Sequence, residues 1–206
     1  MAKDSYAHYL RPASGPNEAP LVITLHGTGG DEHQFANLAD SLFPAATVLS
    51  PRGDVSEHGA LRFFRRTGEG VYDMADLAAR TDKMTSFLSA WKTELRPRKV
   101  LAFGYSNGAN IVASVAFQRP DLFDAIALLH PLIPFEPVAN PALAGLPVLI
   151  TAGHRDPICP APLTTRLQNW FDAQGSAAQT LWHDGGHELR PTEFEALARF
   201  GRDHLT

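Results

Sequence analysis

A serine lies at the centre of the glycine-flanked pentapeptide GYSNG, which spans residues 104–108. The pentapeptide follows an apolar run over 100–103 and opens a segment in which apolar residues recur with helical spacing. A strand, a tight turn and a helix in this order form a nucleophile elbow, which exposes the serine hydroxyl above the end of a sheet. A glycine-rich turn with an incidental serine is the alternative, and the strand–turn–helix context argues against it. The pattern therefore predicts that Ser106 is a catalytic nucleophile.

A serine hydroxyl is a weak nucleophile unless a base takes its proton, so the elbow requires a histidine and an acid. In proteins with this elbow the acid follows the serine along the chain, and the histidine follows the acid. Asp156 comes after the apolar run 148–151, and His187 comes after the run 180–182 and two glycines. Both would then lie at carboxyl ends of strands, where open α/β sheets build their sites. The sequence predicts His187 as the general base and Asp156 as the residue that orients it.

Other acids and histidines compete for these two roles. Asp124 and Asp184 are the alternative acids. His183 lies in or against the last apolar run, where packing is its expected role. His154 is too close in the chain to the predicted acid to come from a different loop, and His130 ends an apolar run, so packing is favoured over a place in the pocket. His187 therefore remains the preferred base.

A second glycine-rich stretch, HGTGGD over 26–31, directly follows the apolar run 21–25 and includes His26. Acyl transfer creates an oxyanion, which needs two N–H donors aimed at it. We expect one from the residue after the nucleophile, Asn107, and the other from this loop, at Thr28 or, as second choice, Gly29. A dinucleotide-binding loop is the alternative, but Glu32 stands where its third glycine is needed. No Gly-Lys-Ser/Thr follows, which excludes a phosphate-binding P-loop.

The histidines near the end of the chain offer weak support for a metal site. His183 and His187 are four residues apart, the spacing of two ligands on one helix face. The intervening Asp-Gly-Gly over 184–186 would break such a helix, so we expect no metal and no cofactor. Cys159 is not at an elbow, and a packed bystander thiol is the expected reading.

Short apolar runs alternate with helical patterns along the whole chain. Most of the runs are continuously apolar, which is typical of strands covered on both faces of a parallel sheet. We expect strands at 21–25, 47–50, 100–105, 125–129, 148–151 and 180–182, and helices at 32–42, 73–95, 106–118, 162–174 and 191–203. This order predicts the α/β class, with a single mostly parallel sheet and helices on both faces.

Length and composition narrow the function further. The 206 residues are enough for one domain with a full apolar core, expected over 1–206, and too few for two such domains. The formal net charge is −4 and no basic run occurs, so a nucleic-acid partner is not expected. The first residues lack the apolar core of a secretory signal, and no run of about 18 apolar residues could cross a membrane. With a single cysteine, these features favour the cytoplasm.

The connection from residue 130 to residue 147 should leave the active site open. Many proteins with this elbow place a helical cap here, but this segment holds five prolines, and proline inside a helix costs about 3 kcal/mol. We therefore expect no helical cap, an extended loop that brings Leu132 and Ile133 near the acyl chain, and a wall formed by Phe63 or Phe64. A shallow site of this kind predicts a preference for short acyl esters.

The motifs together resemble the phospholipase/carboxylesterase family of small α/β-hydrolases, which also contains the acyl-protein thioesterases. The matching stretches are LHGTGGDE (25–32), SPRG (50–53), RFFRR (62–66), FGYSNGANI (103–111), AGHRDPICP (152–160) and GGHEL (185–189). RFFRR and YSNGAN are closest to the bacterial branch of hydroquinone-linked carboxylesterases. The resemblance implies the α/β-hydrolase fold, a triad of Ser106, Asp156 and His187, oxyanion donors at Thr28 and Asn107, and a frequent homodimer. The chain departs from the family at 130–131, where His-Pro stands in place of a small residue, which leaves the shape of the acyl pocket open.

These observations predict a carboxylic ester hydrolase that acts on a small-molecule ester through an acyl-enzyme. A thioesterase or a lysophospholipase with the same triad is the nearest alternative. A ligand-binding protein that has lost catalysis is a more distant one, because such proteins usually lack a triad member and this chain has all three.

Overall fold

The computed structural model describes residues 2–14 and 18–205. Within this part of the chain, seven strands form one sheet in the order β1-β3-β2-β8-β9-β10-β11. Neighbouring strands run parallel except β1, which pairs antiparallel with β3. The strands are β1 (His8–Arg11), β2 (Leu21–Leu25), β3 (Thr47–Pro51), β8 (Val100–Tyr105), β9 (Ala125–Leu129), β10 (Pro147–Gly153) and β11 (Ala177–His183). The predicted mostly parallel sheet is confirmed, and the edge strand β1 is an addition that the sequence did not indicate.

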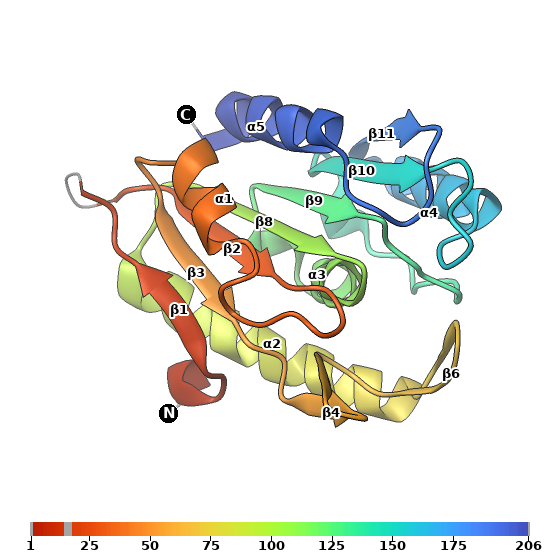
Figure 1. Ribbon diagram of the computed structural model, residues 1–206. Coiled ribbons are helices and arrows are strands. Elements are labelled where there is room, and N and C mark those ends of the chain that lie inside the picture. The colour runs from red at the N-terminus through yellow and green to blue at the C-terminus, as the bar shows by residue number, and fades with distance from the viewer. Residues whose placement is uncertain (1, 15–17, 206) are drawn as a thin grey trace.

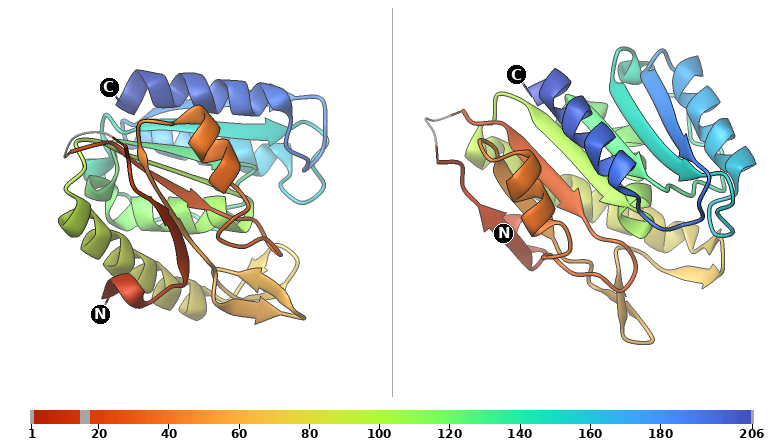
Figure 2. Two further views of the ribbon diagram at one scale, coloured as in Figure 1. Left: turned by 60° about the vertical axis from the view of Figure 1, so that its left-hand side comes forward. Right: turned by 45° about the horizontal axis from the view of Figure 1, so that its top comes forward.

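Helices cover both faces of the sheet (Figures 1 and 2), as predicted. One face carries α1 (Ala36–Leu42) and α5 (Pro191–Leu205), and the other carries α2 (Met74–Leu95), α3 (Asn107–Gln118) and α4 (Ala161–Ala173). Each face has its own apolar core. The residues of β2, β3 and β9 are buried throughout, because side chains on both sides of these strands pack under helices. This double burial explains the continuously apolar runs in the sequence.

Helix α1 begins at residue 36, four residues later than the sequence predicted. The residues before it fold the preceding loop instead. The Gln34 side-chain oxygen accepts the backbone N–H of Gly27 at 2.7 Å, and the Asp31 carboxylate accepts the N–H of His33 at 2.9 Å. Side chains that bond the backbone in this way compete with helix formation, so the turn persists to residue 35.

Two small hairpins lie between β3 and α2, and neither was predicted. They consist of β4 (Val55–Glu57) with β5 (Ala60–Arg62), and β6 (Arg66–Gly68) with β7 (Val71–Tyr72). The segment that joins the hairpins contains Phe63 and Phe64, whose side chains are fully buried. The hairpins thereby carry Arg62 and Arg66 to the end of the sheet at which the predicted site residues lie.

The connection between β9 and β10 contains one short 3-10 helix, η3 (Pro141–Leu143), and otherwise no helix among its residues, all of which the structure describes. Leu132 fixes the start of this connection: its N–H donates to the Asn110 side chain at 2.7 Å, and its carbonyl accepts the Tyr72 hydroxyl at 2.6 Å. The expected absence of a helical cap is therefore observed.

No helix in the described part of the chain has the length and apolar character to cross a membrane.

Candidate active site

Ser106 occupies the turn between β8 and α3 with φ 50° and ψ −114°, in a region that residues other than glycine rarely adopt. The glycines on either side are required by close contacts. A Cβ on Gly104 would collide with the backbone of Gly108, and a Cβ on Gly108 would collide with the carbonyl of Leu25. The turn is therefore the strained, tightly packed elbow that the pentapeptide predicted, with Ser106 at its tip.

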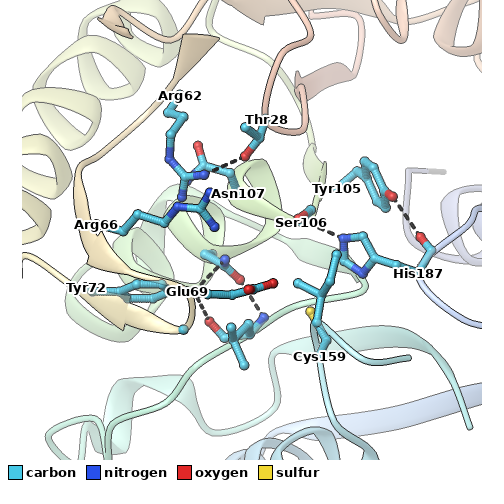
Figure 3. A pocket seen from close by; sticks show the side chains of 14 residues that line it. Thr28, Arg62, Arg66, Glu69, Tyr72, Tyr105, Ser106, Asn107, Cys159 and His187 are labelled. Carbon is cyan, nitrogen blue, oxygen red and sulfur yellow. Dashed lines mark hydrogen bonds between the residues drawn. The ribbon is translucent and has the colours of Figure 1, made fainter. Parts of the chain in front are cut away.

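The structure brings Ser106, His187 and Asp156 together from three separate loops. His187 Nε2 lies 3.0 Å from the Ser106 hydroxyl oxygen, and His187 Nδ1 lies 2.7 Å from Asp156 Oδ2 (Figure 3 shows the serine and the histidine). Because the carboxylate accepts at Nδ1, that nitrogen carries a proton, and Nε2 is left as the acceptor that faces the serine. This is the tautomer that a general base needs in order to take the serine proton.

Asp156 is buried, and every partner on its carboxylate is a donor. Oδ1 accepts the backbone N–H groups of Ile158 and Cys159 at 2.8 and 2.9 Å. Oδ2 accepts from His187 and also from Nδ1 of His130, at 2.8 Å. Burial favours the neutral acid, but the hydrogen bonds from the two histidines and the backbone outweigh it and hold the pKa of Asp156 well below its usual range. The carboxylate is therefore ionised at neutral pH.

A buried glutamate, Glu193, extends this arrangement and was not foreseen from the sequence. Its Oε1 lies 3.1 Å from His130 Nε2 and accepts the Thr151 hydroxyl at 2.6 Å. Its Oε2 accepts the backbone N–H of Arg190 at 2.6 Å and lies 3.4 Å from His183 Nε2. Glu193 stands in the first turn of α5, and an acid near a helix start, which is a common stabilising feature, was the only signal in the sequence.

The competing acids and histidines take other places. Asp124 accepts the N–H of Val100 and the Lys99 ammonium, and Asp184 is exposed. His183 ends β11, as expected, and His154 stacks on Trp182 with ring centroids 4.9 Å apart. His26 is buried and accepts the N–H of Gly53 at Nε2. His130 is fully buried, as favoured from the sequence, but it contacts the predicted acid and does not simply pack against apolar neighbours.

The glycine-rich loop after β2 lies beside the elbow and is tied to the segment between the hairpins. Arg62 Nη1 donates to the Thr28 hydroxyl at 2.8 Å, and the N–H of Phe63 donates to the Asn107 side-chain oxygen at 2.7 Å. The N–H of Gly29 already donates to the Leu61 carbonyl at 2.9 Å. Gly29, the second choice for an oxyanion donor, is thus engaged elsewhere, which favours Thr28.

A cavity of about 330 Å³ opens above Ser106 (Figure 3). Its side chains come from the glycine-rich loop, the two hairpins, the elbow and the loops after β9, β10 and β11; they include Thr28, Arg62, Arg66, Glu69, Tyr72, Tyr105, Asn107, Leu132, Ile158, Cys159 and His187. Leu132, which was expected near the acyl chain, lines this cavity.

Three expected wall residues are not part of this cavity. Phe63 and Phe64 do not line it, because both side chains are buried in the core and leave the hairpin wall to arginine and glutamate. Ile133 does not line it either, because it lies against a separate cavity beside α4. The prediction was wrong for these residues. Both phenylalanines of RFFRR point into the core, and the order of residues in this segment does not show which way their side chains point.

Cys159 lies at the cavity but is not poised as a nucleophile. Its side chain is buried, and its sulfur lies 3.2 Å from the His130 carbonyl. Burial raises the pKa of the Cys159 thiol, and the negative charge of Asp156 raises it further. The thiol therefore stays protonated at neutral pH, which agrees with the packed role expected for it.

Two groups of side chains bring three possible metal ligands within 4.8 Å of one another: His130 with Asp156 and His187, and His130 with His183 and Glu193. The proton positions disfavour a metal at the second group. His183 Nδ1 accepts the N–H of Gly185 at 2.9 Å, so the proton of a neutral imidazole lies on Nε2, the atom that would have to bind the metal. In the first group both histidines meet Asp156 through Nδ1 at hydrogen-bond distance. The clusters are consistent with a proton-bearing network.

Comparison with known proteins places the chain in a family. The model of the dienelactone hydrolase family matches residues 64–189. MhqD of Bacillus subtilis is 41% identical over 187 residues, which are 90% of this chain and 94% of that protein. The Bacillus cereus carboxylesterase has a TM-score of 0.89 at 35% identity, covering 97% of this chain and 94% of that one. Atu2452 from Agrobacterium tumefaciens, described as a protein of unknown function, has a TM-score of 0.91 at 53% identity over 99% of both chains. The chain therefore belongs to the dienelactone hydrolase family and is a carboxylesterase-like α/β-hydrolase.

Proposed function

We propose that this protein is a serine carboxylesterase that hydrolyses small esters through an acyl-enzyme on Ser106. One observation carries the proposal: the hydrogen-bonded chain from the Ser106 hydroxyl through His187 to Asp156, with separations of 3.0 and 2.7 Å, lies at the floor of an open cavity. Family membership supports hydrolysis as the class of reaction.

The reaction follows from the positions of these three groups. The Ser106 oxygen attacks the ester carbonyl carbon while His187 Nε2 takes the serine proton. The tetrahedral intermediate collapses, the bond to the leaving oxygen breaks, and His187 returns the proton to the departing alkoxide. A water molecule then attacks the acyl-enzyme with the same help from His187 and releases the carboxylic acid. Asp156 holds the imidazole tautomer and stabilises the imidazolium that forms in each half of the cycle.

The oxyanion is stabilised by two backbone donors in this proposal. Asn107 is the first residue of α3, and the first N–H groups of a helix have no acceptor within the helix. The N–H of Asn107 and the positive end of the helix dipole therefore face the elbow. Thr28 supplies the second N–H from the neighbouring loop, which its hydroxyl and Arg62 hold in place at 2.8 Å. Preorganised donors of this kind stabilise the oxyanion by about 3 kcal/mol each.

The size and lining of the cavity support small substrates. A volume of about 330 Å³ is at the low end of the range for small-molecule sites. Leu132 and Ile158 offer a short apolar wall, whereas Arg62, Arg66 and Glu69 make the opposite hairpin wall polar. An acyl chain gains binding energy from the apolar wall only over its first carbons. We therefore propose acyl groups from acetate to butyrate or slightly longer.

Covalent labelling tests the proposal. A fluorophosphonate should label the protein stoichiometrically, and the labelled peptide should be the one that contains Ser106. The Ser106→Ala variant should not be labelled. Ser86→Ala, which changes an exposed serine of α2, is the matched control and should be labelled like the wild type. Labelling that persists in Ser106→Ala would overturn the assignment. Parallel kinetics on matched oxygen and sulfur esters then separate an esterase from a thioesterase.

A further inference from the structure

His130 shares one oxygen of Asp156 with the proposed base. It directly follows β9 and adopts a left-handed backbone with φ 51°, and its side chain is fully buried. Its Nδ1 lies 2.8 Å from Asp156 Oδ2, which His187 Nδ1 approaches to 2.7 Å. Its other nitrogen lies 3.1 Å from Glu193 Oε1. One imidazole thus bridges two buried carboxylates that are 37 residues apart in the sequence.

The donors around the two carboxylates fix the charge of this imidazole. Asp156 receives two backbone N–H groups and His187 in addition to His130, and Glu193 receives the Thr151 hydroxyl and the Arg190 N–H. His183 Nε2 lies 3.4 Å from Glu193 Oε2 and 3.4 Å from His130 Nε2. A carboxylate surrounded only by donors is ionised, since a proton on it would displace one of them. Between two ionised carboxylates, His130 donates from both nitrogens, which requires the imidazolium form.

The pKa of His130 agrees with the imidazolium form. Burial opposes a charge on His130, but the hydrogen bonds to Asp156 and Glu193 outweigh burial and raise the pKa of His130 to about 9. The other titratable groups facing the two histidines add little charge. Burial raises the pKa of Tyr105 to about 12 and raises the pKa of Cys159, so both stay neutral, while Glu188 is exposed and paired with Arg190. His183, at the end of β11, presents Nε2 to both Glu193 Oε2 and His130 Nε2, and its Nδ1 accepts the N–H of Gly185.

We propose that His130 is a positioning residue, a buried imidazolium that acts with Glu193 to hold Asp156 ionised and in place and to weaken the pull of Asp156 on the proton of His187. The inference rests on the proposed function, because it concerns the base of that reaction. An isolated buried carboxylate would strongly stabilise protonated His187, which cannot take the serine proton. A cation on the same oxygen offsets that stabilisation, so the base is free at lower pH. The ring centroids of His130 and His187 are 5.2 Å apart, close enough for a substantial effect.

Glu193 explains how a cation is tolerated in this position. Without Glu193, the imidazolium would have no carboxylate at Nε2 and would lose the proton on that nitrogen more readily in a buried site. The second carboxylate retains that proton from the far side of the ring, and the Thr151 hydroxyl and Arg190 N–H hold Glu193 itself. The resulting group of Asp156, His130 and Glu193 carries one net negative charge, the same as Asp156 alone, but with its positive member next to the proposed base.

The first test needs no activity. Histidine side-chain ¹⁵N NMR on the full-length Ser106→Ala protein should show both nitrogens of His130 protonated from pH 6 to pH 8, a range that lies below the value of about 9. The signals are assigned by their loss in His130→Asn. Glu193→Gln removes one counter-charge, so in that variant the His130 signal should titrate at lower pH. A His130 with a single protonated nitrogen at pH 7 in the Ser106→Ala protein, which retains His130, Asp156 and Glu193, overturns the inference.

The second test measures the pH profile of kcat/KM on p-nitrophenyl acetate. The double variant His130→Asn/Glu193→Gln removes both charges, so no buried charge is left unpaired. Asparagine tolerates the left-handed backbone and can still donate to Asp156. The acid limb should move upward by about one pH unit, since the cation beside the proposed base is lost. His58→Asn is the matched control, because His58 is exposed on a hairpin and has the same φ of 51°.

The outcomes separate this inference from the proposed function. An unmoved acid limb in a folded double variant, judged by its circular dichroism and Tm, overturns the role of His130 and leaves the esterase intact. If the wild type turns over no ester, the proposed function fails and the inference fails with it, while the NMR result still reports the charge on His130. If the double variant does not fold, the NMR titration of Glu193→Gln decides, and an unchanged His130 signal there contradicts the proposal.

Discussion

The Tyr105 hydroxyl donates a hydrogen bond of 2.7 Å to the backbone carbonyl of His187, across 82 residues of sequence. Tyr105 immediately precedes the elbow serine, and its ring lies 5.2 Å from the His187 ring. The residue next to the proposed nucleophile thus anchors the loop that carries the proposed base. This contact gives the second position of the GYSNG motif a physical role.

Removing this hydroxyl should reduce catalysis without unfolding the protein. A hydrogen bond of this kind contributes about 0.5–1.5 kcal/mol, so Tyr105→Phe should lower kcat/KM by about 2- to 12-fold. The change retains the ring and its packing. Tyr9→Phe is the matched control, because the Tyr9 hydroxyl contacts Asp40, which does not line the Ser106 cavity. Equal kcat/KM for Tyr105→Phe and the wild type would show that the anchor has no influence on the base.

The choice of His187 as the base can be tested against the nearest competitor. His187→Ala should reduce kcat by about a thousandfold or more with the fold intact, since the serine then lacks a base. His183→Ala should retain activity within about tenfold, because His183 lies against Glu193 and His130, whereas the nitrogen that faces the Ser106 hydroxyl belongs to His187. Steady-state kinetics on the two variants decide between them. The reverse order of effects would mean that the wrong histidine was chosen.

The fold was largely predictable because its signals are local. Continuous apolar runs predicted the interior strands, and three of them, β2, β8 and β9, have the predicted bounds. Proline near the start of α4 and α5 marked both helices. The edge strand β1 was not predicted because all four of its residues are only partly buried, so it lacks the apolar run of an interior strand. The hairpins β4–β7 have two or three residues per strand, too few to form a recognisable period.

The site was predictable only where the chain carries local motifs. Strand–turn patterns led to Ser106, Asp156 and His187, which the structure brings together. Glu193 was missed because its partners His130 and Thr151 are 63 and 42 residues away, and nothing local marks a helix-start glutamate as buried. The prediction of the cavity-wall residues in RFFRR was wrong for a similar reason. Contacts with distant parts of the chain fix this segment: Arg62 donates to Thr28 in the glycine-rich loop, and the backbone of Phe63 donates to Asn107 at the elbow.

The charge on His130 should also make stability depend on pH. The pKa of His130 is raised from 6.5 to about 9 in the folded protein, so its contribution is complete below pH 6.5 and is lost as the pH rises through about 9. This linkage is worth about 3 kcal/mol at most. Asp156 and Glu193 have lowered pKa values, and their contributions are lost only as the pH falls well into the acid range.

Thermal unfolding checks this dependence. The Tm of the wild type should fall between pH 6.5 and pH 9.5, and the fall should be clearly smaller in His130→Asn/Glu193→Gln. Parallel falls in the two proteins would show that His130 does not carry a raised pKa.

The short apolar wall of the cavity should limit the length of acyl chain over which binding energy is gained. On p-nitrophenyl esters from acetate to palmitate, kcat/KM should rise by up to about fourfold per carbon over the first carbons and then level off. Ile158→Ala should flatten the initial rise, because Ile158 lines the cavity. Val138→Ala, which changes a side chain that is 87% exposed and does not line the cavity, should leave the profile unchanged. A steady climb to the longest soluble ester would point to a deep acyl channel and to lysophospholipase activity.

The central claim is that an acyl group passes through Ser106, and mass spectrometry of the protein during turnover tests it most directly. We expect rapid acid quenching of a reaction with p-nitrophenyl acetate to trap one acetyl group per chain, and peptide mapping to locate it on Ser106 in the elbow between β8 and α3. The Ser106→Ala variant should carry none. Hydrolysis by the wild type with no trapped acetyl group, or an acetyl group on another residue such as Cys159, would contradict the account.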